Sequence, residues 1–505
     1  MSIFQNLLYG FSVCLEPFNL FACFFGVLLG TFVGVLPGLG PVAAISLLLP
    51  ITFKIPTTAS LIMLAGIFYG AMYGGSTTSI LMNIPGEAAS VVTCLDGYQM
   101  AKKGRAGPAL GISAFGSFIA GTFGVLGVML LAPPMVSIAL KFGPPEYVGL
   151  IILGLVMVVY LSSKSLLKAL LIAVIGLLLG TIGVDPMVGT PRFNYGSTTL
   201  LNGLEIPPVV MGLFGLSEVL VNIEKVIKQE VFKTKFKGLL PNKKDWKNSA
   251  FPIVRGSAIG FFLGILPGVG SIIPTFVSYT LEKRFSKYPE KFGTGIIEGV
   301  AAPESANNSA STAGFIPLLT LGVPPNVIMA LLFGALLVHG IQPGPLLMTQ
   351  HPDVFWGVIA SMYIGNIMLL ILNLPLIPIW VKILKIPYPI LFPLILLFCL
   401  IGGYSVNGNP VDVLIMVIFG VVGYIMRKLQ FEAAPFVLAF ILGPLLEVGM
   451  RHSLVISRGS FKIFFQRPIA LTFLCVAAFF FFSSLFTFFL KSRRMLPKES
   501  QYEDA

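Results

Sequence analysis

The sequence predicts an all-α polytopic membrane protein built from two inverted-topology repeats, each with a re-entrant helical hairpin and broken helices. Three observations lead to this fold class: the composition, a duplicated glycine- and proline-rich motif, and opposite charge bias in equivalent loops. Of the 505 residues, 56% are hydrophobic and 11% are charged, whereas soluble chains carry roughly 25% charged residues. Long apolar runs favour helical spans over the short alternating segments of a membrane β-barrel.

Apolar segments long enough for spans of about 20 residues recur along the chain. They fall at residues 18–53, 59–84, 109–140, 145–161, 165–184, 207–222, 253–281, 294–338, 354–380, 387–404, 410–426, 434–450 and 469–490. The first, seventh and eighth of these segments are broken by polar, Gly and Pro residues. The expected division is a first membrane repeat, a basic cytoplasmic linker, a second membrane repeat, and an interfacial segment with a terminal span and a cytoplasmic tail, at residues 1–222, 223–252, 253–450 and 451–505.

The two halves of the chain share a motif that should interrupt a helix. GVLPGLG at residues 34–40 recurs as GILPGVG at residues 264–270. A shift of 230 residues aligns seven identical positions in a window of 15 residues, five of them Gly and one Pro. NIPGE at 83–87 similarly resembles GVPPN at 322–326. Internal duplication of broken membrane segments is typical of transporters.

Loop charge indicates that the repeats are inverted. The loop ITFKIPTT after the first motif has one basic residue, whereas its counterpart EKRFSKYPEK has four. Later in each half the bias reverses, because AKKGRAG at 101–107 has three basic residues and its counterpart at 341–353 has no Lys or Arg. Basic loops face the cytoplasm, so equivalent loops lie on opposite faces. Segments 253–281 and 18–53 are then re-entrant hairpins that enter from opposite sides.

The two ends of the chain raise separate questions of topology. Because there is no Lys or Arg before Lys54, residues 1–30 are expected to be retained and the N-terminus to face away from the cytoplasm. Counting the predicted membrane spans along the chain places residues 450–467 outside the cytoplasm, although they carry four basic residues. Either this segment lies along the interface, or one span of the second half is miscounted.

The duplicated motif supplies the first candidate binding residues: Pro37, Gly38, Gly40, Gly268 and Gly270. Broken backbone at membrane depth requires cover from protein or water. The N-termini of half-helices favour carboxylates, and free carbonyls near Gly38 and Gly268 suit Na⁺. The alternative reading is a tight turn or close helix packing through glycine.

A second kind of break is expected in two polar runs, YGGSTTSILMNIPGE at 73–87 and APESANNSASTAG at 302–314. Their hydroxyls and amides can bind a carboxylate without burying a positive charge. The candidates are Ser76, Thr77, Thr78, Asn83, Asn307, Asn308, Ser309, Ser311 and Thr312. The alternative is that these side chains bond their own backbone or a neighbouring helix.

Three acidic residues, Glu87, Glu298 and Glu304, flank or lie within these runs. A carboxylate inside a membrane is costly and points to a proton or cation site, or else it caps a half-helix or pairs with a loop Lys. The sequence has no Walker motif, HExxH or GxSxG, so no enzyme chemistry is expected. The net charge of +12 is explained by basic cytoplasmic loops rather than by nucleic-acid binding.

These motifs together resemble the large membrane subunit of tripartite tricarboxylate transporters, the TctA family. The similar stretches are 34–53, 66–111, 264–314, 334–347 and 457–470. The resemblance implies that the break residues line a transport site and that no cofactor is needed beyond Na⁺ or H⁺ as coupling ion. The chain departs from the family pattern at Pro324, Pro325 and Asn326, where the family has a GIPG-like motif.

The resemblance also implies partners and a location. The partners are a small four-helix membrane subunit, an extracytoplasmic solute-binding protein, an organic carboxylate and the lipid bilayer, in the inner (cytoplasmic) cell membrane. The leading hypothesis is an ion-gradient-driven importer of a carboxylate. The alternatives are a stand-alone secondary transporter of the same fold, and a channel or membrane scaffold.

Overall fold

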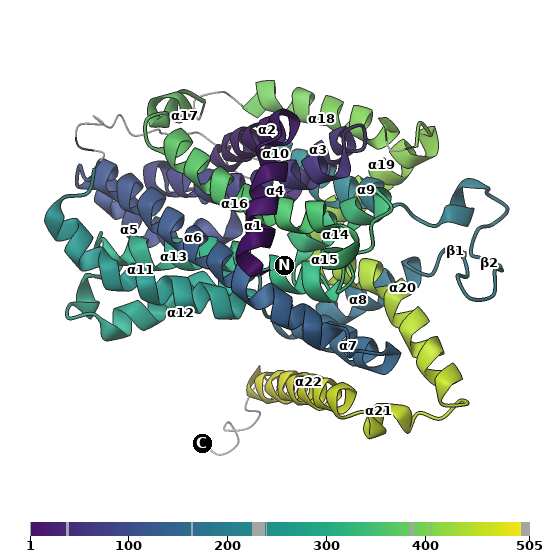
Figure 1. Ribbon diagram of the computed structural model, residues 1–505. Helices are drawn as coiled ribbons and strands as arrows, with labels where there is room; N and C mark the ends of the chain where they lie inside the picture. The colour runs from purple at the N-terminus through teal and green to yellow at the C-terminus, as the bar shows by residue number, and fades with distance from the viewer. Residues whose placement is uncertain are drawn as a thin grey trace, which may run out of the picture.

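The protein is a helical bundle in the computed structural model, with one short β-hairpin projecting on a loop (Figure 1). The structure describes residues 2–36, 40–162, 165–224, 238, 240–383, 388–405 and 407–495. Strands β1 and β2 form the hairpin and pair antiparallel, with Gly183 opposite Arg192. The all-α, multi-spanning class predicted from the sequence is confirmed.

The first half of the chain ends at α10, just before the basic linker. Its elements are α1 (Ile3–Cys14), α2 (Pro17–Val35), α3 (Gly40–Thr52), α4 (Thr57–Met82), η1 (Ala88–Ser90), α5 (Val91–Lys102), α6 (Ala106–Ala139), α7 (Pro144–Tyr160), α8 (Leu166–Leu179), β1 (Gly183–Val184), β2 (Pro191–Arg192), η2 (Thr199–Asn202), α9 (Ile206–Val210), η3 (Met211–Leu216) and α10 (Ser217–Glu224).

The second half begins with α11, which starts inside the predicted linker. Its elements are α11 (Lys243–Gly264), α12 (Ile272–Phe285), η4 (Pro289–Lys291), α13 (Glu298–Ala313), η5 (Pro317–Leu321), α14 (Val327–Val338), α15 (Leu347–Gln350), α16 (Pro352–Asn373), α17 (Ile377–Ile383), α18 (Tyr388–Ser405), α19 (Pro410–Lys428), α20 (Ala433–Ile456), α21 (Ile463–Gln466) and α22 (Pro468–Met495). Residues 225–237 and 239 of the linker lie outside the described residues.

Eight helical segments in the described part of the chain are long and apolar enough to cross a bilayer. They are α2, α4, α6, the continuous run from α9 to α10, α16, α19, α20 and α22. The window of α4 is fully buried in the protein, whereas that of α22 is 11% buried. Accordingly, α4 lies at the centre of the bundle, and α22 packs beside α7 at its edge (Figure 1).

Each half contains a pair of helices in backbone contact along a stripe of glycines. The stripe residues are Gly26, Gly30 and Gly34 on α2, and Gly256, Gly260 and Gly264 on α11. A Cβ added at Gly30 would lie 2.4 Å from the carbonyl oxygen of Ile67 on α4, and one at Gly260 would lie 2.3 Å from that of Ala306 on α13. Glycine every fourth residue lets two helix backbones touch. The duplicated sequence therefore forms the same helix contact twice.

The chain breaks fall within the duplicated glycine and proline motifs. α2 ends at Val35 and α3 begins at Gly40, while α11 ends at Gly264 and α12 begins at Ile272. Two later helices end at residues with a left-handed backbone. Asn83 (φ 58°) ends α4, and Gly322 (φ 68°) ends η5. These are equivalent positions of NIPGE and GVPPN, so the breaks are duplicated as well.

The second polar run is helical, which corrects the expectation that it is a break, whereas the first run is helical to Met82 and breaks at residues 83–87. Residues 73–82 complete α4, and residues 302–313 belong to α13. The hydroxyls bond to carbonyls one turn earlier in their own helix, as Ser79 does to Gly75 (3.0 Å) and Thr312 to Asn308 (3.0 Å). Such bonds satisfy the side chain without opening the backbone. In the second half the break comes only after the run, at residues 322–326.

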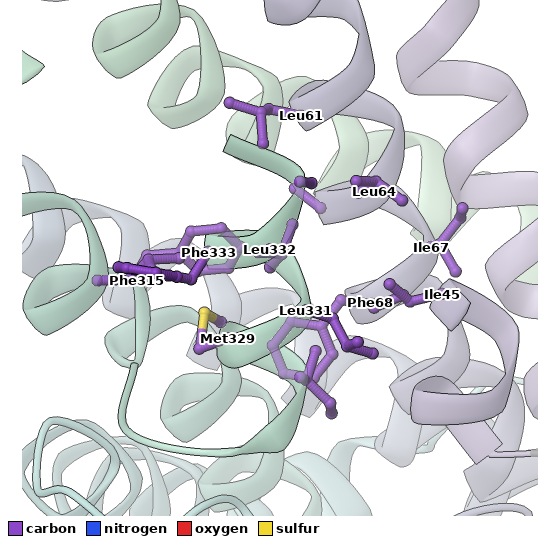
Figure 2. Packing of buried hydrophobic residues seen from close by; sticks show 14 of the residues in the cluster. Ile45, Leu61, Leu64, Ile67, Phe68, Phe315, Met329, Leu331, Leu332 and Phe333 are labelled. Carbon is purple, nitrogen blue, oxygen red and sulfur yellow. The ribbon is translucent and has the colours of Figure 1, made fainter. Parts of the chain in front are cut away.

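A large hydrophobic core joins the two halves. Ile45, Ile67 and Phe68 from α3 and α4 pack against Phe315 and Leu331 from the second half (Figure 2). The ring centroids of Phe68 and Phe315 are 6.3 Å apart. Because helices of both halves contribute to this core, the breaks of the two halves are held close together.

The β1–β2 hairpin is fastened to α20 by charged residues. The Asp185 carboxylate accepts hydrogen bonds from the backbone N–H of Met187 (2.8 Å) and from Arg451 Nη1 (2.7 Å). These two donors hold the pKa of Asp185 down at about 2. Arg192 Nη1 in turn lies 2.8 Å from Glu447 Oε1. α20 continues through residue 450 to Ile456, so Arg451 lies on this helix.

Candidate functional site

A cavity of about 440 Å³ lies where four chain breaks meet. Its wall contains the starts of α3, η1, α12 and α14, which are four helix N-termini. The lining residues at these starts are Gly40, Pro41, Pro85, Gly86, Glu87, Gly268, Gly270, Ser271, Pro325 and Asn326. Helix N-termini carry partial positive charge and unpaired N–H groups, so their convergence favours an anion.

The second glycine motif has a backbone that other residues rarely adopt. Gly268 and Gly270 have φ of +82° and +58°. A Cβ at Gly268 would lie 2.8 Å from backbone atoms of Met157 and Val158 on α7. The N–H of Gly268 donates to the carbonyl of Pro325 (2.7 Å). Glycine is therefore required at 268 both for its conformation and for space, and this position ties two of the breaks together.

The first glycine motif is described at residues 34–36 and at Gly40. Gly40 begins α3 with φ of +57° and lines the cavity. Pro37 and Gly38 lie outside the described residues, so their assignment to the site, and that of nearby carbonyls to Na⁺, stay predictions.

Glu87 is the acidic residue of the NIPGE break, and it lines the cavity while being 6% exposed. One carboxylate oxygen accepts the backbone N–H of Ala89 (2.5 Å), and the other accepts Asn307 Nδ2 (3.0 Å). At the equivalent position in the second half, Asn326 caps α14 by accepting the N–H of Met329 (3.0 Å). The two caps are therefore alike in geometry, but one is ionisable and the other is neutral.

Glu304 lies behind the cavity wall, in the middle of α13, and is 1% exposed. Its carboxylate accepts hydrogen bonds from Ser76 (2.5 Å), Ser113 (3.0 Å) and Thr93, which belong to α4, α6 and α5. Among the described residues it forms no ion pair. A buried carboxylate held by neutral hydroxyls is expensive as a bare anion, and such a site suits a proton or a small cation.

Other predicted residues on α13 connect the cavity wall to the Glu304 cluster. Ser311 Oγ lies 3.3 Å from Ser271 Oγ, which lines the cavity. Asn308 Nδ2 donates to Ser117 Oγ of α6 (2.7 Å). Ser309 Oγ and Asn307 Oδ1 are buried without a hydrogen-bond partner among the described residues. Thr312 bonds to Asn308 within α13.

The remaining predicted residues have structural contacts or lie elsewhere. Thr78 donates to the carbonyl of Val35 (2.7 Å) and holds α4 against the end of α2. Thr77 is buried in α4, whereas Asn83 is exposed at the end of this helix. Glu298 is the first residue of α13 and lines a separate polar pocket with Arg255 and Lys291. The lining of the 440 Å³ cavity includes none of these residues.

Two charged residues of the cavity wall are absent from the sequence-based candidates. Glu218 of α10 and Arg427 of α19 both line the cavity and form an ion pair. Each half of the sequence ends with a Glu, a Pro, an apolar run and a second Glu, which are Glu205, Pro207 and Glu218 in the first half and Glu432, Pro435 and Glu447 in the second. Glu218 stands out in the sequence only through this match with Glu447. Arg427 shares its short basic segment with Lys428, which resembles a topology signal. Their contact joins residues 209 positions apart, and no local pattern predicts it.

Many apolar helices around a cavity walled by helix N-termini are typical of a multi-pass membrane protein of the transporter class. The chain matches the family described as "Tripartite tricarboxylate transporter TctA family" over residues 20–438. It belongs to this family, which confirms the resemblance found in the sequence. The family is one of transporters, in keeping with the lack of enzyme motifs in the sequence.

Two relatives from Agrobacterium vitis are similar over long stretches. An uncharacterized 52.8 kDa protein in the TAR-I ttuC′ 3′ region is 51% identical over 476 residues, which cover 94% of this chain and 95% of the relative. An uncharacterized protein in the TAR-II ttuC′ 3′ region is 54% identical over 211 residues, covering 42% of this chain and 87% of the relative. No solved structure matches the chain.

Proposed function

We propose that this chain is the large membrane subunit of a tripartite importer that takes up an organic carboxylate together with Na⁺ or H⁺. The observation that carries the proposal is the cavity at which α3, η1, α12 and α14 begin. Donors of this kind bind carboxylates without a buried cation. Membership of the TctA family supports transport as the activity.

The proposed coupling site is Glu304 with its hydroxyl donors, and Glu87 is its link to the cavity. Asn307 donates to Glu87 (3.0 Å) and lies one turn after Glu304 on α13. A proton or Na⁺ at Glu304 removes the cost of the bare buried charge. Binding of the proton or Na⁺ at Glu304 is transmitted through α13 to the wall of the carboxylate site. The backbone carbonyls near Gly38 and Gly268 are the second proposed place for Na⁺.

The proposed arrangement in the membrane is two inverted repeats whose hairpins, α2–α3 and α11–α12, enter from opposite faces. The chain is placed in the inner (cytoplasmic) membrane and works with a small four-helix subunit and an extracytoplasmic solute-binding protein. Support comes from opposite loop charges and from the duplicated glycine contacts of α2 and α11. Labelling of single cysteines at positions 54 and 287 tests the inversion, and labelling of both from one side would refute it.

Uptake by the reconstituted complex tests the function. Di- and tricarboxylates and aromatic acids are offered to proteoliposomes with an imposed Na⁺ or pH gradient, with and without the two partner proteins. We expect gradient-driven uptake of a carboxylate that requires all three proteins. Uptake by the large subunit alone would instead support the stand-alone transporter, and a lack of carboxylate uptake under every condition would reject the proposal.

Glu304→Gln tests the coupling role. A glutamine keeps the size and one acceptor oxygen for Ser76, so the fold should be retained, but it can neither be protonated nor neutralise Na⁺. We expect gradient-driven accumulation to be lost while exchange of substrate across the membrane continues. Glu290→Gln is the control, because Glu290 is an exposed acidic residue of η4 away from this cluster. Normal accumulation by Glu304→Gln would remove Glu304 from the coupling mechanism.

A further inference from the structure

Arg427 and Glu218 form an ion pair in the wall of the 440 Å³ cavity. Arg427 lies in the last turn of α19, and Glu218 lies in the first turn of α10. Among the described residues that line the cavity, Arg427 carries the positive charge, and Glu218 and Glu87 carry the negative charges. A cavity proposed to hold an anion thus contains an arginine that is already occupied by an internal carboxylate.

We propose that Arg427 binds one carboxylate of a substrate that bears at least two, and that Glu218 is the counter-ion which this carboxylate displaces. The inference rests on the carboxylate transport proposed above and deepens it. It makes Arg427 the residue that selects substrates by their number of carboxylates.

The geometry of the pair leaves Arg427 able to accept a second partner. Nη1 of Arg427 lies beside one carboxylate oxygen of Glu218, and a guanidinium has five N–H donors in a planar fork. The Arg427 side chain is 36% exposed and the Glu218 side chain is 11% exposed. Glu218 also accepts Asn222 Nδ2 (3.0 Å) through its other oxygen. Glu218 is therefore held in place when Arg427 turns toward a ligand.

The matching position in the second half shows a different arrangement. Glu447, the counterpart of Glu218, contacts both Arg192 (2.8 Å) and Arg451 (2.9 Å), and Arg451 also contacts Asp185 (2.7 Å). That network uses two arginines to satisfy two carboxylates and fastens the β1–β2 hairpin. An ion pair with a buried partner is weak evidence for stability, because desolvation of the charges offsets much of their attraction. Stability alone therefore gives little reason to place this pair in the cavity wall.

The position of Arg427 explains why two carboxylates are needed. The helix starts that favour one carboxylate belong to α3, η1, α12 and α14, whereas Arg427 comes from α19. Apolar side chains such as Val158, Phe214 and Leu438 line the cavity as well. A substrate with a short carbon skeleton and a carboxylate at each end would occupy both polar regions and place its skeleton against these side chains. A monocarboxylate would fill one region and leave Arg427 paired with Glu218.

Ligand binding to the purified membrane complex tests this assignment without the solute-binding protein. The probes are butyrate, succinate and tricarballylate, which carry one, two and three carboxylates. Apparent Kd values come from the rise in unfolding temperature with ligand concentration. The variants are Arg427→Gln, Arg427→Lys, Glu218→Gln and the matched control Lys428→Gln, which removes a positive charge one residue away in a pair with Glu224 outside the cavity lining.

We expect Arg427→Gln to raise the Kd of succinate and tricarballylate about tenfold, the loss of one charge-assisted contact, while the Kd of butyrate changes less than twofold. Arg427→Lys should recover part of the loss, and Glu218→Gln should lower the Kd of succinate by removing the competing carboxylate. Lys428→Gln should match wild type. The unfolding temperature without ligand reports whether each variant folds.

The outcomes separate the two hypotheses. Binding of succinate or tricarballylate to wild type, with an unchanged Kd in Arg427→Gln or an equal rise for butyrate, overturns the role of Arg427 and leaves carboxylate transport intact. If the wild-type complex binds none of the three acids and takes up no carboxylate, the proposed function fails and the role of Arg427 fails with it.

Discussion

Gly268→Ala should destabilise the cavity wall. The added Cβ would lie 2.8 Å from the Met157 carbonyl carbon and the Val158 nitrogen, and backbone atoms of a packed helix cannot move aside easily. The left-handed conformation at φ +82° costs a residue with a Cβ about 1–2 kcal/mol. Overpacking adds about 1–3 kcal/mol. The free energy of unfolding should therefore fall by roughly 2–5 kcal/mol, the sum of these two costs.

The effect on transport should exceed the effect on folding. Relief of the contact with α7 requires residue 268 to shift, which disturbs the hydrogen bond from its N–H to the carbonyl of Pro325 (2.7 Å). That shift separates two of the four chain breaks around the cavity. We expect the purified variant to unfold at a lower temperature than wild type and to lose gradient-driven uptake even at temperatures where it stays folded.

Gly154→Ala is the matched control for this substitution. Gly154 lies in the middle of α7, and a Cβ there would lie 3.7 Å from Pro267 Cβ, an ordinary van der Waals contact. Alanine is the better helix former by about 1 kcal/mol, so this variant should unfold at the wild-type temperature or above it. Wild-type stability and uptake in Gly268→Ala would refute the reasoning, and so would equal damage in Gly154→Ala.

Two further predictions concern the helix contact and the hairpin. Gly260→Ala should sharply reduce the yield of folded protein in size-exclusion chromatography, because its Cβ would lie 2.3 Å from the Ala306 carbonyl oxygen; a normal yield would mean that α11 and α13 can separate. Asp185 has its pKa lowered to about 2, so its charged form favours the docked hairpin above about pH 4, and this contribution is lost as the pH falls toward 2. Hydrogen exchange of residues 183–192 should therefore show the same protection factors at pH 7 and pH 5, whereas Asp185→Asn should lower protection at both pH values.

The apolar helices and the breaks are predictable because their signals are local. The segment predicted at 109–140 is α6 at Ala106–Ala139, and the Gly–Pro motif ends α11 at Gly264. The sequence does not reveal that residues 302–313 are helical. Ser, Asn and Pro are weak helix formers in isolation, but in α13 these side chains bond their own turns and the helices around them.

The charged wall of the cavity is beyond local prediction for a different reason. Glu87 and Gly268 stand out because a break in an apolar segment marks them. Arg427 has no such mark, since a basic residue at the end of an apolar helix is ordinary. Its place beside Glu218 is set by how α10 and α19 pack, which depends on contacts between the two halves of the chain. Short helices such as α1, at Ile3–Cys14, are missed because they are shorter than a span.

The glycine stripes of α2 and α11 have a mechanical consequence. A helix whose backbone contacts a neighbouring helix at three successive turns is interlocked with it, and it cannot slide by a fraction of a turn. The next position in which the glycine contacts fit lies about 5–6 Å along the helix axis, the length of one helical turn. Each pair, α2 with α4 and α11 with α13, therefore has to travel as one stiff body. A rearrangement that opens the cavity and keeps these helix pairs intact would bend the chain at the breaks beside them, where the proposed binding groups are located.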